Sequence, residues 1–115
     1  MLPKDYRLKK RSAFKATYKI GNTVYSGGIT AFCGRKKNND YPTKIGFVVS
    51  KKIHKRAVKR NRIKRLMRES YRLAIKNREL SKQYMSVIFV ASSKLLEKDF
   101  QYINTHINKL ADKLW

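Results

Sequence analysis

Acidic and histidine side chains are the first candidates for chemistry, because a protein that cleaves phosphodiesters needs an acid–base pair or carboxylates that gather metal ions. The seven acids are scattered along the chain: Asp5, Asp40, Glu69, Glu79, Glu97, Asp99 and Asp112. The two histidines, His54 and His106, lie in separate parts of the sequence. Serine-nucleophile motifs, phosphate-binding glycine loops and zinc-ligand spacings are missing. The pattern favours a binding protein over a catalyst, with a two-histidine nuclease as an open alternative.

A dense basic run is the strongest signal in the sequence. Residues 51–68 read KKIHKRAVKRNRIKRLMR, in which ten of eighteen residues are Lys or Arg, and no acid occurs between Tyr41 and Arg68. The whole chain of 115 residues carries a formal net charge of +22. Solubility alone favours mixed signs, whereas a field of one sign is best tolerated when a polyanion neutralises it. We therefore expect nucleic acid as the partner, with a membrane surface as the weaker alternative.

The same run has the spacing of a helix rather than of a disordered tail. Helical periodicity extends from Ala57 to about Ala74, and Val58, Ile63, Leu66 and Met67 are spaced as a packed face. Asn61, Arg65, Arg68 and Arg72 fall in a narrow sector nearly opposite Ile63 and Leu66. The sequence thus predicts an amphipathic helix with a cationic outer face. We expect His54 to be a loop or RNA-contacting residue and His106 to lie on the solvent side of its helix.

Further elements must position this helix. Ser12 as N-cap and Gly21 as terminator predict a helix over about 12–20. Apolar alternation predicts strands over 29–33 and 44–50, taken as an antiparallel pair, and an apolar central strand over 85–91. Helical spacing resumes over 96–114. The order α-β-β-α-β-α predicts one α/β sandwich domain, residues 1–115, with a helix crossing between the second and third strands.

Composition limits the remaining possibilities. Apolar residues make up 42% of the chain, enough for one core at this length. Cys33 is the only cysteine, so we expect a buried hydrophobe and no internal disulfide. No apolar run approaches the length that spans a bilayer, and the first residues lack the apolar core of a signal peptide. We expect a cytoplasmic protein.

Three aromatic residues allow two interpretations. Phe14 and Tyr18 share a face of the first helix, and Phe32 lies on a neighbouring strand. They are either core residues or the walls of a groove in which unstacked bases lie against rings.

Three segments, SAFKATYKIGN, KIGFVVSKK and AVKRNRIKRLMRESYR, resemble the protein component of bacterial ribonuclease P, the small basic subunit of a ribozyme that removes 5′ leaders from precursor tRNA. The resemblance implies an α+β two-layer sandwich like the second domain of ribosomal protein S5, with a left-handed βαβ crossover. It implies that the RNA subunit performs Mg²⁺-dependent hydrolysis and binds most of the Mg²⁺. The protein then supplies no catalytic residue, binds the catalytic RNA and precursor tRNA, broadens the substrate range and requires no protein partner.

The resemblance also assigns two sets of binding residues. Those facing the RNA subunit are Arg60, Asn61, Arg62, Lys64, Arg65 and Arg68. Those taking the 5′ leader are Phe14, Tyr18, Thr30, Phe32, Val48 and Ser50, with Lys51 and Lys52 at the rim. Metal-binding residues are not assigned.

Two departures from the family pattern occur. The stretch 54–56 replaces a glycine and a shorter loop, and Tyr18 stands where Phe is common. A ribosomal protein of the same fold that binds rRNA and a nonspecific DNA-binding protein remain alternatives.

Overall fold

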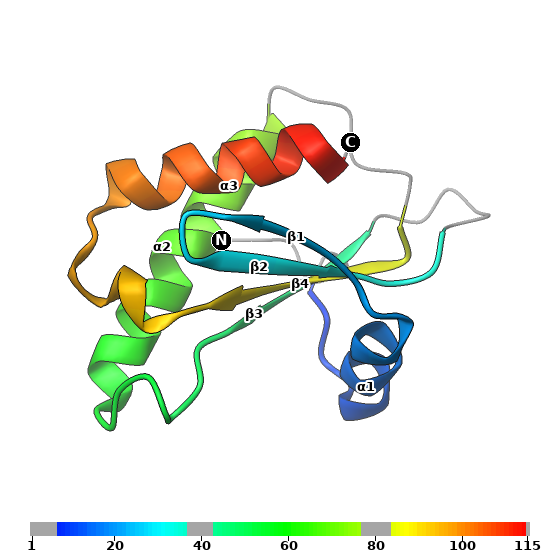
Figure 1. Ribbon diagram of the computed structural model, residues 1–115, viewed down its shortest axis with the longest axis horizontal. Helices are drawn as coiled ribbons and strands as arrows, with labels where there is room; N and C mark the ends of the chain where they lie inside the picture. Colours follow the sequence, from blue (N-terminus) through cyan, green and yellow to red (C-terminus); the bar gives the residue numbers. More distant parts are fainter. Residues whose placement is uncertain (1–6, 37–42, 77–83, 115) are drawn as a thin grey trace.

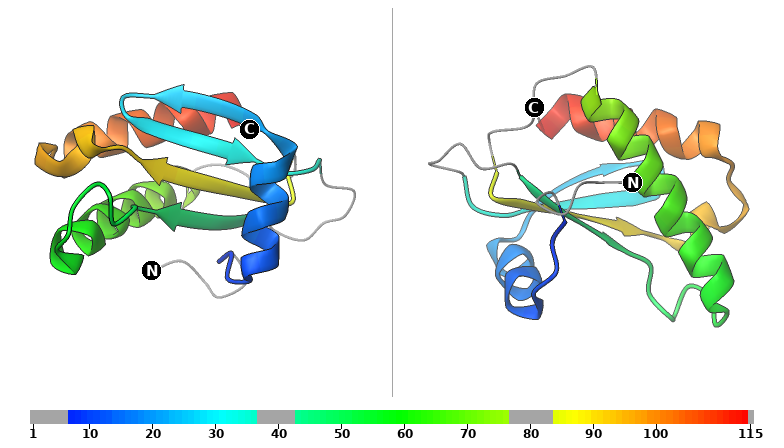
Figure 2. Two further views of the ribbon diagram at one scale, coloured as in Figure 1. Left: turned by 60° about the horizontal axis from the view of Figure 1, so that its bottom comes forward. Right: turned by 180° about the vertical axis from the view of Figure 1, so that it is seen from behind.

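The computed structural model describes residues 7–36, 43–76 and 84–114. A four-stranded sheet carries one helix on one face and two on the other (Figures 1 and 2). The helices are α1 (Arg11–Ile20), α2 (Ala57–Lys76) and α3 (Phe100–Leu114), with a short 3-10 helix η2 (Ser93–Glu97) before α3. The strands are β1 (Asn22–Ser26), β2 (Ile29–Cys33), β3 (Lys44–Val48) and β4 (Ser86–Ala91). The predicted sandwich is confirmed. The structure adds one strand, β1, that the sequence did not predict.

The strand order is β1-β2-β4-β3, so β4 lies between β2 and β3. The prediction that β2 and β3 pair with each other is therefore wrong: β2 is antiparallel to β4, and β3 is parallel to it. The central place suits β4, whose Val87, Ile88 and Phe89 are fully buried. Helix α2 connects the parallel strands β3 and β4, and the left panel of Figure 2 shows it behind the sheet in a left-handed crossover. This is the handedness that the resemblance implied, against the usual preference.

Helix α1 starts one residue earlier than the sequence suggested. The carbonyl of Lys10 accepts hydrogen bonds from the amides of Ala13 and Phe14, at 3.0 and 3.1 Å, so Ser12 lies inside the first turn and the prediction that it is the N-cap is wrong. At the other end, Gly21 has a φ of 79° and ends the helix as predicted.

Strand β1 forms a tight hairpin with β2. Gly27 and Gly28 have φ angles of 55° and 96°, which fits a two-residue turn that demands positive φ, and Ser26 pairs with Ile29 across it. Most of β1 is exposed, because it is an edge strand with polar residues at most positions. That lack of apolar alternation is why the sequence did not predict it.

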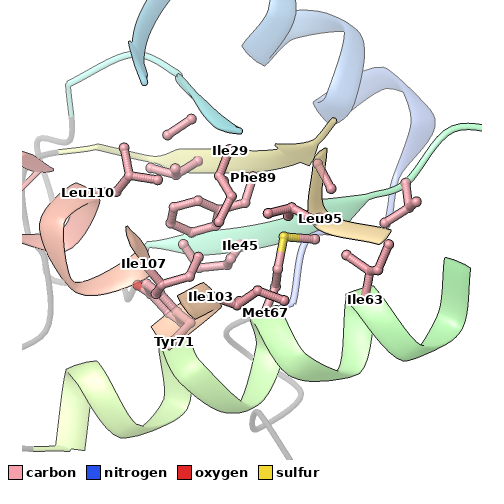
Figure 3. Close-up of a cluster of buried hydrophobic side chains, with 14 of the residues drawn as sticks. Ile29, Ile45, Ile63, Met67, Tyr71, Phe89, Leu95, Ile103, Ile107 and Leu110 are labelled. Carbon is pink, nitrogen blue, oxygen red and sulfur yellow. The ribbon is translucent and has the colours of Figure 1, made fainter. Parts of the chain in front are cut away.

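The main core lies between the sheet and the pair α2 and α3 (Figure 3). Ile63, Met67 and Tyr71 of α2 point into it at four-residue spacing, and the Tyr71 ring centre lies 5.5 Å from that of Phe89. Cys33 is buried, as expected. Val58 is 76% exposed, so its predicted place in the packed face is wrong. It lies five residues before Ile63, which turns its side chain about 140° away from the core.

His106 does not lie on the solvent side of its helix, contrary to the sequence prediction. Its Nδ1 is 2.7 Å from the Ser26 hydroxyl, and its ring centre lies 4.5 Å from that of Tyr102. The prediction failed because β1, which packs against α3 here, was not foreseen. Burial lowers the pKa of His106 below its ordinary value, and nearby Lys109 and Lys94 add to this effect.

Candidate nucleic-acid interface

The outer face of α2 is cationic, as its periodicity predicted. Asn61 and Arg65 are exposed, while Lys64 and Arg68 are half-buried. Arg65 makes no hydrogen bond or ion pair with another described residue. The first turn contains no acidic residue, although carboxylates would be favoured there by the helix dipole. The helix thus keeps positive charge where its own stability would favour the opposite sign.

Arg60 is engaged with the loop that precedes α2. Its Nη1 donates hydrogen bonds to the carbonyls of His54 and Lys55, each at 2.9 Å. The ring of His54 in turn accepts a hydrogen bond at Nδ1 from the Arg56 amide, at 3.0 Å. His54 is therefore a loop residue, as expected. Arg60 fixes the loop where the chain departs from the family pattern, in addition to any contact with a partner.

Two other arginines of α2 have partners inside the protein. Arg62 donates to the carbonyl of Lys98, at 3.1 Å, and so connects α2 with the segment before α3. Arg72 pairs with Glu69 at 2.5 Å. The hydrogen bond with Arg72 lowers the pKa of Glu69, and the same bond raises the pKa of Arg72. The ion pair neutralises Arg72, so the free cationic sector consists mainly of residues 61–68.

The second predicted set lies on the sheet face that carries α1. Phe14 reaches over Gly46 of β3: a Cβ added to that glycine would stand 2.7 Å from the ring. Tyr18 packs edge-on against Phe32 with ring centres 4.9 Å apart. Burial raises the pKa of the Tyr18 hydroxyl, although the residue is still 37% exposed. The rings thus pack α1 against the sheet and remain partly exposed, and the groove for unstacked bases stays a prediction.

The strand register shows what lies beside these rings. Thr30 pairs with Val90, and Val90 pairs with Val48, so one row of half-buried side chains crosses β2, β4 and β3 on the α1 face. Val90 was missed as a site residue because β4 was predicted as a wholly buried strand. Val90 lies two residues after Ile88 and therefore on the same face of β4, and this alternation could have identified it from the sequence.

Ser50, Lys51 and Lys52 are exposed and begin two residues after the end of β3 at Val48. The Ser50 hydroxyl accepts a hydrogen bond from the Lys52 amide at 3.2 Å, and the Ser50 carbonyl accepts one from the Ile53 amide at 3.0 Å, which forms a turn. This turn leads from the sheet row to the first residues of α2 (Figure 1). The fold therefore joins the two predicted sets through one short segment, residues 49–56.

The described residues contain no group of three or more His, Cys, Asp or Glu side chains that could hold a metal ion. Among the described helices, none is both long and apolar enough to cross a membrane.

Fold and site together define a small, strongly basic α/β sandwich with an arginine-rich helix on one face of the sheet and partly exposed aromatic rings on the other. A family model described as Ribonuclease P matches residues 2–115, and the chain belongs to this family. The ribonuclease P protein component of Caldanaerobacter subterraneus subsp. tengcongensis is 40% identical over 113 residues, covering 98% of this chain and 92% of that protein.

Solved structures agree. The ribonuclease P protein of Staphylococcus aureus has a TM-score of 0.75 and 28% identity, covering 97% of this chain and 100% of that one. The protein from Thermotoga maritima, at 24% identity and a TM-score of 0.76, covers 95% of this chain and 97% of that one and shows the common fold.

Proposed function

We propose that this chain is the RNA-binding subunit of a ribonuclease P holoenzyme that removes the 5′ leader of precursor tRNA. The observation that carries the proposal is the junction of two surfaces: residues 49–56 connect the cationic sector of α2 with the partly exposed aromatic face of the sheet beside α1, where we place the groove. Phosphate contacts from arginine and lysine bind RNA without regard to sequence, and exposed rings bind unstacked bases. One protein can thus hold a structured RNA and a single strand at the same time.

The cationic sector is assigned to the catalytic RNA. Arg65 is exposed and free to contact a phosphate, and Asn61 beside it can add hydrogen bonds to RNA. Arg60 and Arg62 hold the loop and the α2–α3 contact, so their substitution disturbs the protein as well as the interface.

The groove is assigned to the leader. In this proposal Tyr18 and Phe32, whose rings pack edge to face, form the walls of the groove, and the row Thr30, Val90 and Val48 forms its floor. Lys51 and Lys52 bring positive charge to one end. A single strand with stacked bases and an anionic backbone is the occupant that this combination fits.

In this proposal the chemistry belongs to the RNA, with Mg²⁺ bound mainly there, as membership of the ribonuclease P family suggests. In this proposal the protein works in the cytoplasm and broadens the range of precursors that the RNA processes.

One experiment tests the assignment as a whole. Precursor tRNA is incubated at low Mg²⁺ with the protein alone, with the ribonuclease P RNA alone and with both. We expect cleavage to be strongest with both and absent with the protein alone. Cleavage by the protein alone would overturn the auxiliary role, and equal cleavage with and without the protein would favour another RNA partner, such as rRNA.

The groove has a matched pair of variants. Tyr18 and Ile20 lie on the same helix and are 37% and 38% exposed, but only Tyr18 contacts Phe32. In the holoenzyme, we expect Tyr18→Ala to weaken binding of leader-bearing precursor by about 5-fold or more, since stacking on one base contributes roughly 1–3 kcal/mol. Ile20→Ala should have little effect, and neither variant should change binding of mature tRNA. Equal losses for precursor and mature tRNA would contradict a leader site.

A further inference from the structure

Tyr25 is an exposed aromatic residue on the same sheet face as the groove. It lies on β1 and is 58% exposed. The register pairs it with Thr30, so the row that crosses β2, β4 and β3 continues onto β1 and ends at Tyr25. Thr23, two residues earlier, pairs with Phe32, which makes Tyr25 a diagonal neighbour of Phe32 on one face. Diagonal pairs are about 7–8 Å apart, within reach of aromatic side chains.

The backbone around Tyr25 is held from the opposite side of the sheet. Lys113 of α3 donates to the Tyr25 carbonyl at 3.4 Å, and the Ser26 hydroxyl contacts His106 at 2.7 Å. The Tyr102 hydroxyl donates to the carbonyl of Gly27 at 2.9 Å. These contacts fix the end of β1 while the ring of Tyr25 stays on the α1 face. The ring is therefore a positioned surface group, unlike a side chain on a free loop.

A single exposed aromatic residue is ordinary on a protein surface, and alone it would indicate nothing. Two observations distinguish Tyr25: its register continues the row of side chains that includes Thr30, and the contacts of its neighbours with α3 fix the end of the strand that carries it. A fixed and exposed ring of this kind can stack on a base.

We propose that the single strand in the groove continues across the sheet to β1, where Tyr25 stacks on one further base of the RNA. The inference rests on the proposed function, because the strand that reaches Tyr25 is the leader held by the groove. It adds a base-binding position on the edge strand, so the protein holds a longer stretch of leader than the groove between α1 and the sheet alone.

Three variants of the full chain, assembled with ribonuclease P RNA, test this position. Tyr25→Ala should weaken binding of a precursor with a long leader by about 5-fold, at the lower end for a stacking contact because the ring is open to solvent. Tyr25→Phe keeps the ring and should bind within about 2-fold of wild type, since stacking needs no hydroxyl. Asn22→Ala, an exposed residue of the same strand on the opposite face, is the control and should bind as wild type does. Wild-type affinity of Tyr25→Ala for the long leader would overturn the inference.

Abasic substitutions along the leader locate the contact. In the wild-type holoenzyme, removing the base that stacks on Tyr25 should weaken binding, and in Tyr25→Ala this penalty should vanish at that position alone. Tyr18→Ala should keep it. The stacking role is wrong if, in Tyr25→Ala, removal of a base weakens binding less than in wild type at every leader position, because the variant then disturbs the whole groove. If the wild-type holoenzyme binds precursor and mature tRNA equally, the proposed leader site as a whole is refuted. That result differs from a failure of the Tyr25 position alone.

Discussion

Replacing Arg65 by alanine should remove one phosphate contact and leave the fold unchanged. The side chain is exposed on the cationic sector and has no hydrogen-bond partner among the described residues. Each lost phosphate contact flattens the dependence of log K on log salt by about 0.7–0.9. Over one decade of salt this corresponds to about a five- to eightfold loss of affinity for the RNA subunit at the low-salt end, or about 1 kcal/mol.

Arg60→Ala is the informative contrast. It removes the same charge one turn earlier, but also two hydrogen bonds to the carbonyls of His54 and Lys55. We expect an additional loss of about 1 kcal/mol from the preceding loop, since these bonds are partly exposed. Arg60→Ala should therefore weaken RNA binding even at high salt, where Arg65→Ala approaches wild type.

The assay is a titration of labelled RNA subunit with each protein over roughly one decade of salt, with thermal unfolding of the free proteins alongside. Lys109→Ala, which removes an exposed charge from α3, controls for net charge. If Arg65→Ala and Lys109→Ala have the same slope as wild type, Arg65 does not contact phosphate and the assignment of the α2 face is refuted. If Arg60→Ala loses no more than Arg65→Ala, the loop contacts do not matter for binding.

Three predictions concern the fold. Gly46→Ala should displace the ring of Phe14 and lower the free energy of unfolding by about 1–3 kcal/mol, and an unchanged denaturation midpoint would contradict the close approach. Ser70→Ala should raise that free energy by about 1 kcal/mol, because the fully buried hydroxyl has no hydrogen-bond partner among the described residues and alanine favours helices; a loss of stability would show a missed partner. The lowered pKa of His106 means that the unfolded chain binds its proton first, so stability should fall as the pH drops through about 6.5 and then level off below the folded pKa. Denaturant titrations from neutral to mildly acid pH should show this slope, and a His106→Asn variant should lose it.

Local patterns predicted most helices and strands well. The four-residue spacing of Ile63, Met67 and Tyr71 identified α2 and its buried face, and Gly21 identified the end of α1. Edge strand β1 was missed because an edge needs no apolar alternation, and its absence from the prediction also misplaced His106. The predicted pairing of β2 with β3 was wrong because the most apolar strand, β4, takes the central place between them. The length of the loop between β2 and β3 does not show this.

For the candidate site, sequence supplied the residue types and the structure divided their roles. The cationic sector of α2 followed from periodicity and charge. That Arg60 holds the loop, while Arg65 is free, follows only from the folded positions of the His54 and Lys55 carbonyls. Likewise Val90 and Tyr25 join Thr30 through strand register, which links residues distant in sequence.

The sequence by itself indicated a strongly basic α/β protein of the ribonuclease P family and the helix that carries much of its positive charge, because charge and helical period are local properties of the chain. Only the tertiary structure decided which arginines of α2 have partners inside the protein and which rings share a face of the sheet. Those depend on contacts between strands and helices that meet only after folding.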